Sequence, residues 1–126
     1  SRALIKKMVS LEMMVKQSAN LGAFVSGLYT EDYKLIGRSM KDLVIEPFRS
    51  ILIPDFEKLK QVSYSNGALG FGISGSGPSV FALSKGLTTA KNIENAMKKI
   101  YDSLDLDYDV HVSPVNDKGI KIIKKL

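Results

Sequence analysis

The sequence predicts a single α+β domain in which helices come first and a β-α-β-β segment follows. Apolar residues recur at helical spacing over 11–28 and again over 56–62. A glycine-rich run over 67–79 comes next, and strand-like and helix-like patterns alternate over 79–123. The chain has 126 residues, of which 44% are hydrophobic and 25% charged. That length and composition fit one globular domain with a core of its own.

Composition and charge exclude several classes of protein. No apolar run approaches the roughly 20 residues that cross a bilayer, so no membrane partner is expected. The chain has no cysteine and one histidine, which excludes thiolate and histidine-cluster metal sites and favours a cytoplasmic location. Although the net charge is +5, the lysines are scattered and no aromatic residues alternate with them. The charge is therefore interpreted as solvated lysine-rich faces rather than a nucleic-acid surface.

The first helix is predicted over 11–28, with Ser10 as its N-cap. Its apolar residues fall on one stripe, made of Leu11, Met14, Val15, Leu21, Val25 and Leu28. Gly22 and Gly27 interrupt the pattern, and each costs about 1 kcal/mol relative to alanine in a helix. Both glycines are therefore interpreted as positions where another helix packs closely.

Side chains that can cap a helix predict three further helices. Thr30 is expected to cap one that ends near Met40, and Asp55 one that stops at the Asn-Gly pair 66–67. One residue of the threonine pair 88–89 is expected to cap the last helix. That helix keeps helical spacing through Ile93, Ala96, Ile100 and Leu104.

Prolines bound the connection between the second and third helices. Pro47 disfavours an α conformation at Glu46, so residues 44–49 are predicted to be extended or turn-like. The guanidinium of Arg49 in this connection could hold a carboxylate or phosphate through two parallel hydrogen bonds. A surface ion pair with Glu46 or Asp42 is an equally weighted alternative.

Three apolar stretches after the glycine run predict strands. Residues 79–83 read as a buried strand, and 108–112 alternate with the period of a half-exposed one. That alternation places His111 on the polar face, as a residue that faces solvent. Residues 120–123 are predicted to form the last strand.

The glycine run over 67–79 predicts a loop that suits an anion or a small polar ligand. Its glycines allow positive φ angles and close approach, while Ser74, Ser76 and free N–H groups supply hydrogen-bonding atoms. A Gly-x-Gly-x-x-Gly match lies within the run, but the dinucleotide motif follows a strand and opens a helix. Here a helix precedes and a strand follows, so that motif is rejected. The serines are interpreted as hydrogen-bonding groups of the loop rather than as nucleophiles.

Five segments together carry a resemblance to a known family. The run over 67–79 reads Gly-Ala-Leu-Gly-Phe-Gly-Ile-Ser-Gly-Ser-Gly-Pro-Ser. It closely resembles the C-terminal motif of the GHMP kinases, the galactokinase, homoserine kinase and mevalonate kinase superfamily. Leu-Ile-Gly-Arg-Ser-Met over 35–40, Ile-Glu-Pro-x-Arg over 45–49 and Leu-Ile-Pro-Asp-Phe over 52–56 narrow the resemblance to the homoserine kinases. It continues to Pro-Val-Asn-x-x-Gly over 114–119 and so covers nearly the whole chain.

This resemblance implies transfer of the γ-phosphate of ATP to the hydroxyl of L-homoserine, giving O-phospho-L-homoserine in threonine biosynthesis. In that family the ATP-binding Gly-Leu-Gly-Ser-Ser motif and the Mg²⁺ ligands lie in an N-terminal domain, and residues 1–126 contain neither. Residues 1–126 would then be the C-terminal domain, a ferredoxin-like two-layer sandwich of antiparallel sheet and helices whose first strand precedes Ser1. Alone, this domain is expected to lack kinase activity and to bind neither ATP nor Mg²⁺ tightly.

The resemblance also implies which residues form the site. Arg49 matches a residue that holds the carboxylate of the amino acid, and Arg2 matches a second substrate arginine. The glycine run would form one wall of the pocket, beside the phosphate-binding loop of the other domain. The wall residues are Gly72, Ser74, Gly75, Ser76 and Gly77. No catalytic residue and no metal ligand is assigned to these 126 residues.

Two alternatives stay open beside the homoserine kinase interpretation. One is the C-terminal domain of another GHMP kinase, acting on mevalonate or a sugar. The other is a non-catalytic, ferredoxin-like module that binds an amino acid. The expected partners are L-homoserine and the N-terminal domain, and a homodimer is one candidate assembly.

Overall fold

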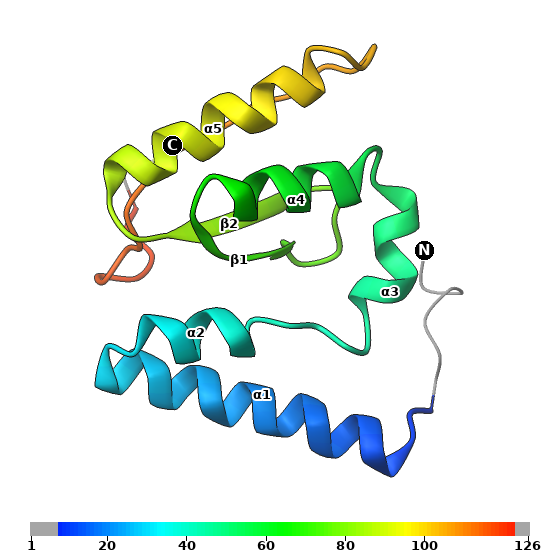
Figure 1. Cartoon of the computed structure of the whole chain (residues 1–126), viewed down its shortest axis with the longest axis vertical. Helices are drawn as coiled ribbons and strands as arrows, with labels where there is room; N and C mark the ends of the chain where they lie inside the picture. Colours follow the sequence, from blue (N-terminus) through cyan, green and yellow to red (C-terminus); the bar gives the residue numbers. More distant parts are fainter. Residues whose placement is uncertain (1–7, 123–126) are drawn as a thin grey trace.

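The computed structural model describes residues 8–122, and these form an α+β domain (Figure 1). The chain order is helices first, a β-hairpin next and a long helix last. The periodicities predicted the early helices, the second strand of the hairpin and the last helix, whereas the first strand lies in the predicted glycine loop. The elements are α1 (Leu11–Thr30), α2 (Tyr33–Ser39), α3 (Glu46–Arg49), a 3₁₀ turn (Ser50–Leu52), α4 (Phe56–Ser65), β1 (Ala68–Ile73), β2 (Val80–Ser84) and α5 (Leu87–Tyr101). None of these helices is long and apolar enough to span a membrane.

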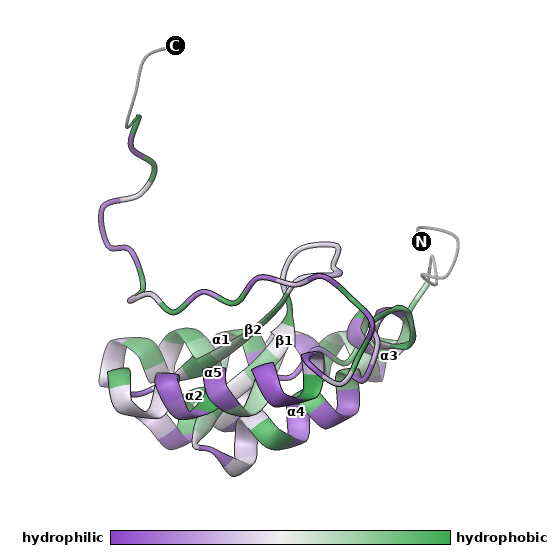
Figure 2. Cartoon of the chain, turned by 90° about the horizontal axis from the view of Figure 1, so that it is seen from above, coloured by the Kyte–Doolittle hydropathy of each residue, from purple (hydrophilic) through white to green (hydrophobic). Residues whose placement is uncertain are grey.

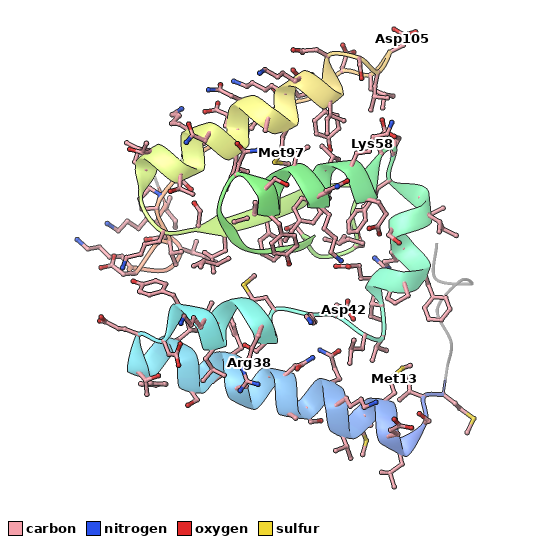
Figure 3. All side chains as sticks on the ribbon, in the orientation of Figure 1. Met13, Arg38, Asp42, Lys58, Met97 and Asp105 are labelled. Atoms are coloured by element: carbon pink, nitrogen blue, oxygen red, sulfur yellow. The ribbon has the colours of Figure 1, made fainter. Side chains whose placement is uncertain are left out.

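The sheet is an antiparallel hairpin of β1 and β2, with Phe71 opposite Ala82 and Ile73 opposite Val80. Figure 1 shows α4 and α5 on one side of the hairpin and α2, with α1 beyond it, on the other. The core lies between the hairpin and the α4–α5 pair. Its buried members are Ile53, Phe56, Leu59, Phe71, Ile93 and Met97, the last of which is labelled on α5 in Figure 3.

On the side of the hairpin that faces α2, two glycines allow the backbone of one element to approach the other closely. A Cβ atom at Gly70 of β1 would clash with the side chain of Met40, and one at Gly37 of α2 would lie 2.9 Å from the carbonyl oxygen of Leu69. Real Cβ atoms do not come this close to other atoms, so only glycine lets β1 pack against α2 in this way. These glycines therefore fix the strand against the segment that leads to Arg49.

Helix α1 begins as predicted, with the Ser10 hydroxyl accepting a hydrogen bond from the Met13 N–H. Gly27 is a close-packing position, because its Cβ would lie 3.0 Å from Ile36 of α2. The predicted apolar stripe, however, faces away from α2. All six of its side chains are exposed: Leu11, Met14, Val15, Leu21, Val25 and Leu28.

Two of the three predicted N-caps are wrong, and the third is correct in position only. Thr30 is the last residue of α1, where its hydroxyl donates to the Ser26 carbonyl. Helix α2 is capped by Asp32, whose carboxylate accepts the N–H groups of Lys34 and Leu35. Asp55 stands at the N-cap position of α4 in a left-handed conformation, with φ 51° and no capping hydrogen bond. Gly86 precedes α5, which leaves Thr88 and Thr89 inside the first turn. At the starts of α2 and α5, a residue other than the predicted one occupies the N-cap position.

The connection over 44–49 was predicted to be extended or turn-like, and residues 46–49 form the short helix α3 instead. Helix α3 begins at Glu46 because proline at the first helical positions needs no N–H partner there and already has a helical φ. The carboxylate of Asp42 replaces the missing cap by accepting the N–H groups of residues 44–46 at 2.8–3.1 Å.

The glycine run is only half a loop. Ala68–Ile73 form β1, and the loop proper is the turn over 74–79. The predicted strand at 79–83 is confirmed as β2, shifted by one residue, although Phe81 is exposed rather than buried.

The two later strands are absent from the described residues. Residues 108–112 have no ladder partner, yet Tyr108, Val110 and Val112 are half-buried while Asp109 and His111 are exposed, as the period-two pattern predicts. Residues 120–122 also form no strand, and residue 123 lies outside the described range. Alternation alone does not make a strand, because a strand also needs a neighbour to accept and donate its backbone hydrogen bonds.

Candidate functional site

Arg49 ends helix α3, with its backbone N–H bonded to the carbonyl of Ile45 at 3.1 Å. Its side chain is half-buried, and its Nε atom is buried without a hydrogen-bond partner in the described part of the chain. A buried donor that forms no hydrogen bond costs about 1–3 kcal/mol, so natural proteins keep few of them. The Nε of Arg49 is therefore an exception that calls for a partner from outside residues 8–122.

Neither carboxylate considered as an ion-pair partner is available to Arg49. Asp42 lies in the connection between α2 and α3 (Figure 3) and accepts three backbone N–H groups there. Glu46 instead forms an ion pair with Lys60 of α4. Among residues 8–122, Arg49 takes part in no ion pair, so the alternative of a surface pair with Glu46 or Asp42 is wrong.

The Glu46–Lys60 pair is well shielded, with 12% of the Glu46 side chain and 30% of the Lys60 side chain exposed. Burial alone would lower the pKa of Lys60, but the hydrogen bond and negative charge of Glu46, with smaller help from Glu57, raise it above 10.5. Lys60 is therefore held in its charged form. The pair joins α3 to α4 and fixes the segment that carries Arg49.

A cavity of about 320 Å³ lies beside this pair, between α2, the following connection and α4. Its lining includes Met40, Asp42, Glu46, Lys60 and Tyr64. Arg49 does not line it, so this cavity and the Arg49 guanidinium are separate features.

The turn between β1 and β2 spans 74–79 and is closed by two backbone hydrogen bonds. The Ser74 N–H donates to the Ser79 carbonyl at 2.8 Å, and the Gly77 N–H donates to the Ser74 carbonyl at 3.1 Å. Gly75 and Gly77 have φ angles of 59° and 74°, which L residues rarely adopt. Within the described residues, the N–H groups of Gly75 and Ser76 donate to no acceptor, so they are available to an anion.

The turn lies against the segment that carries Arg49. Figure 1 shows it at the end of the hairpin that faces α3. A Cβ atom at Gly77 would be 3.5 Å from Ile53, four residues after Arg49, and one at Gly72 would be 3.9 Å from a carboxylate oxygen of Glu46. The structure thus brings the turn and α3 to one end of the hairpin.

The predicted wall residues divide into two kinds. Ser74, Gly75 and Ser76 are exposed at the tip of the turn. The Ser76 hydroxyl makes a long contact of 3.4 Å to the Gly77 carbonyl. Gly72 is buried in β1, where the ring of Phe81 would lie 3.3 Å from an added Cβ. Gly72 therefore acts through packing. Arg2 lies outside the described residues.

Lys60 was missed by reasoning from the sequence. It lies 14 positions after Glu46, too far for a local pairing rule, and its Lys-Leu-Lys context reads as the polar face of a helix. Only the fold brings the two side chains together.

A second cavity, of about 500 Å³, lies between α4 and α5 and is separate from the cavity beside Lys60. Polar and charged side chains dominate its lining, among them Asp55, Lys58, Asn92, Asn95 and Lys99. Among the described residues, no group of three or more His, Cys, Asp or Glu side chains could hold a metal ion.

Comparison with known proteins gives concordant results. The family model described as GHMP kinases C terminal matches residues 15–103. Homoserine kinases of Chlorobium phaeobacteroides and Chloroherpeton thalassium are both 42% identical to the chain over 125 and 124 residues, which is 98% of the chain in each case. The chain spans 39% of the length of both relatives.

A solved structure gives the same result in three dimensions. The crystal structure of homoserine kinase from Cytophaga hutchinsonii superposes with a TM-score of 0.90 at 47% identity, over 94% of this chain and 38% of that one. The fold described above is therefore that of the C-terminal region of these proteins.

Proposed function

The chain belongs to the GHMP kinases through their C-terminal domain, and from this we propose that it is the substrate-side domain of a homoserine kinase. The whole protein would transfer the γ-phosphate of ATP to the hydroxyl of L-homoserine. The relatives that support this proposal are named homoserine kinases and are more than twice as long as this chain.

The observation that carries the proposal is the buried, unpaired Nε of Arg49. An amino-acid substrate brings a carboxylate, and a guanidinium binds a carboxylate through two parallel N–H···O bonds, one of them often from Nε. Occupation by the homoserine carboxylate would satisfy this donor and orient the far end of the substrate. Because phosphoryl transfer depends mainly on positioning and charge stabilisation, an orienting arginine suits the reaction.

The turn over 74–79 is proposed as the neighbouring wall. Its free N–H groups at Gly75 and Ser76 point to an anionic group, and the phosphate being transferred is the anion that the reaction supplies. The second predicted arginine, Arg2, stays a prediction.

ATP and Mg²⁺ are proposed to bind the N-terminal domain of the longer protein, with the turn of this domain beside them. When bound, Mg²⁺ would neutralise charge on the β- and γ-phosphates. This domain then contributes recognition of the amino acid and one side of the pocket. A cytoplasmic location likewise stays a prediction.

The longer protein is also proposed to complete the sheet. Among the described residues, strand β2 pairs only with β1, and residues 108–112, which are half-buried at every second position, have no ladder partner. A strand from the chain before Ser1, as the resemblance implies, would supply a partner for both.

A substrate panel tests the proposal. The longer protein with ATP should phosphorylate L-homoserine far faster than mevalonate or galactose, because neither alternative presents an α-amino acid. Turnover of mevalonate or galactose in preference to homoserine would assign the chain to another GHMP kinase.

The isolated 126 residues test the remaining alternative. They should show no ATP turnover, and calorimetry should detect at most weak binding of L-homoserine or threonine. Tight binding by the isolated chain would favour a free-standing amino-acid-binding module instead.

A further inference from the structure

Glu46 and Arg49 stand at the two ends of α3, one helical turn apart. The Ser50 N–H donates to the Glu46 carbonyl, so the helix closes a full turn between them. Side chains three positions apart on a helix are neighbours, and opposite charges at that spacing attract each other. The Nε of Arg49 is nevertheless buried without a hydrogen-bond partner within residues 8–122. The local sequence therefore favours an ion pair that the fold does not form.

Lys60 of α4 prevents that pair by engaging the acid. Its ammonium group binds the Glu46 carboxylate and is, in the described part of the chain, the one side-chain partner of that carboxylate. The Lys60 ammonium also lies 5.7 Å from the ring centre of Phe56, a buried member of the core. Figure 2 shows purple, hydrophilic stretches alternating with green, hydrophobic ones along α4, so Lys60 reaches Glu46 from a helix that the core holds in place.

The other nearby acid, Asp42, cannot replace Glu46 as a partner of Arg49. Its carboxylate accepts three backbone N–H groups at 2.8–3.1 Å, all from the four residues that follow it. Glu46, in contrast, is held by a single residue of a distant helix. Lys60 alone therefore decides whether Arg49 has an acidic competitor within the domain.

A Glu46 side chain released from Lys60 would have two cations to choose from. It lines the cavity of about 320 Å³ together with Lys41, but Lys41 is exposed to water. An exposed ion pair contributes little to stability. Pairing with Arg49 would instead give a partner both to a shielded carboxylate and to a buried donor that has none. Arg49 is therefore the favoured second partner.

We propose that Lys60 is a positioning residue for the substrate: by holding the Glu46 carboxylate, it keeps the Arg49 guanidinium free for the carboxylate of the amino acid. This inference rests on the function proposed above for Arg49. Without Lys60, Glu46 and the substrate would compete for the same guanidinium. The apparent affinity for the substrate would then fall in proportion to the fraction of molecules in which Arg49 is still free.

Lys60→Met in the longer protein tests the proposal, because it removes the charge and keeps the apolar stem beside Phe56. With Arg49 occupied by Glu46 in most molecules, the KM for L-homoserine should rise about 3–10-fold. The kcat and the KM for ATP should stay within about twofold of wild type, since the bound substrate has already displaced Glu46. The link between α3 and α4 is also lost, so stability falls even though Glu46 gains a new partner.

Two controls keep other charges or the same charge in place. Lys58→Met removes a lysine of the same helix that pairs with Asp55 and lies toward α5 (Figure 3), so it should leave the homoserine KM unchanged. Lys60→Arg keeps a cation beside Glu46 and should keep the KM near that of wild type.

Glu46→Gln separates this role from simple support of the fold, because it breaks the same bridge from its other side. If the bridge were merely structural, Glu46→Gln and Lys60→Met would raise the homoserine KM equally. The proposal instead predicts a KM near wild type for Glu46→Gln and for the double variant, because a neutral amide competes weakly for a guanidinium. Equal rises in the two single variants, or a double variant as impaired as Lys60→Met, would overturn it.

The ¹⁵N NMR signal of the Arg49 Nε–H group follows the pairing without any substrate. In the longer protein, with the signal assigned through its loss in Arg49→Ala, it should shift in Lys60→Met and return in the double variant with Glu46→Gln. A signal that Lys60→Met does not move would overturn the proposal. Where Lys60→Met does not fold, Lys60→Gln gives the same comparison with a smaller shift, because its amide carries no charge.

Arg49→Ala separates failure of this inference from failure of the proposed function. If Arg49→Ala leaves the homoserine KM unchanged, the role proposed for Arg49 fails and the inference about Lys60 falls with it. If Arg49→Ala raises that KM and Lys60→Met does not, only the inference about Lys60 fails.

Discussion

Lys60 and Arg49 are two shielded cations within a few residues of the same proline-bounded connection, and they differ in what surrounds them. Lys60 pairs with a carboxylate of its own domain, and its pKa is raised as a result. Arg49 is left with a buried Nε and no partner among the described residues. Lys60 therefore joins two helices of the fold, whereas the proposed partner of Arg49 is a ligand.

The same contrast appears in the carboxylates nearby. Asp42 and Glu46 could each have paired with Arg49, but one caps α3 and the other holds Lys60. Arg49 therefore has acidic neighbours in the sequence, but both of their carboxylates already bind other groups of the domain. An arrangement that reserves a guanidinium lowers stability and is retained where function requires it.

The largest effect on stability is expected from Lys60→Met. This change strands the Glu46 carboxylate, whose side chain is only 12% exposed, and should lower the free energy of unfolding by about 1–3 kcal/mol. Urea unfolding followed by circular dichroism measures it. Lys58→Met on the same helix is the control, because the Lys58 side chain is 68% exposed and its pair with Asp55 should contribute less than about 1 kcal/mol. Equal losses in the two variants would remove the structural role given to Lys60.

An intermediate and pH-dependent effect is expected from Glu94→Gln on α5. Hydrogen bonds from Lys91 and Lys98, at 2.7 and 2.8 Å, lower the pKa of Glu94 from 4.5 to about 2. Since the folded pKa lies below the unfolded one, the stabilisation is full above pH 4.5 and is lost as the pH falls toward 2. Unfolding curves at several pH values should therefore show wild type and variant converging in acid. A constant difference across that range would contradict this assignment.

The smallest effect on stability is expected from Arg49→Met. The substitution removes a buried donor that forms no hydrogen bond in the domain and keeps the apolar part of the side chain. The free energy of unfolding of the chain without substrate should change by less than about 0.5 kcal/mol or should rise. A loss as large as that of Lys60→Met would mean that Arg49 holds the fold, and the comparison between the two cations would fail.

Local patterns were enough to predict much of the fold. The periodicity of 11–28 and the Asn-Gly stop at 66–67 located α1 and the end of α4. These features depend on residues close in sequence. The hairpin after α4 was predicted only in its second strand, because the first strand lies in the run that was expected to be a loop.

Features that depend on distant partners could not be read from the sequence. Residues 108–112 have the alternation of a strand but no ladder neighbour, and the stripe of α1 has the period of a buried face but lies outward. The periodicity of apolar residues shows which side chains share one face of a helix or strand, but not which element, if any, covers that face. Likewise, Pro47 was expected to disfavour a helical conformation at Glu46. Its favourable position in the first turn of α3 had the stronger influence on the backbone there.

The candidate site was predicted in part for the same reason. Arg49 and the turn over 74–79 stand out by residue type, and the structure brings their segments to one end of the hairpin. The state of Arg49, buried at Nε and unpaired, depends on the use of Asp42 and Glu46 elsewhere. Only the three-dimensional arrangement excluded the surface ion pair, and ligand binding by Arg49 stays a prediction.

The central claim, that Arg49 holds the carboxylate of homoserine, is tested most directly by Arg49→Ala in the longer protein with two substrates. L-homoserine carries the carboxylate, and 3-amino-1-propanol is the same amino alcohol without it. The account predicts that the KM for homoserine rises about 10–100-fold, while that for ATP and the kcat/KM for 3-amino-1-propanol change little. An unchanged KM for homoserine, or an equal loss with both alcohols, would contradict it.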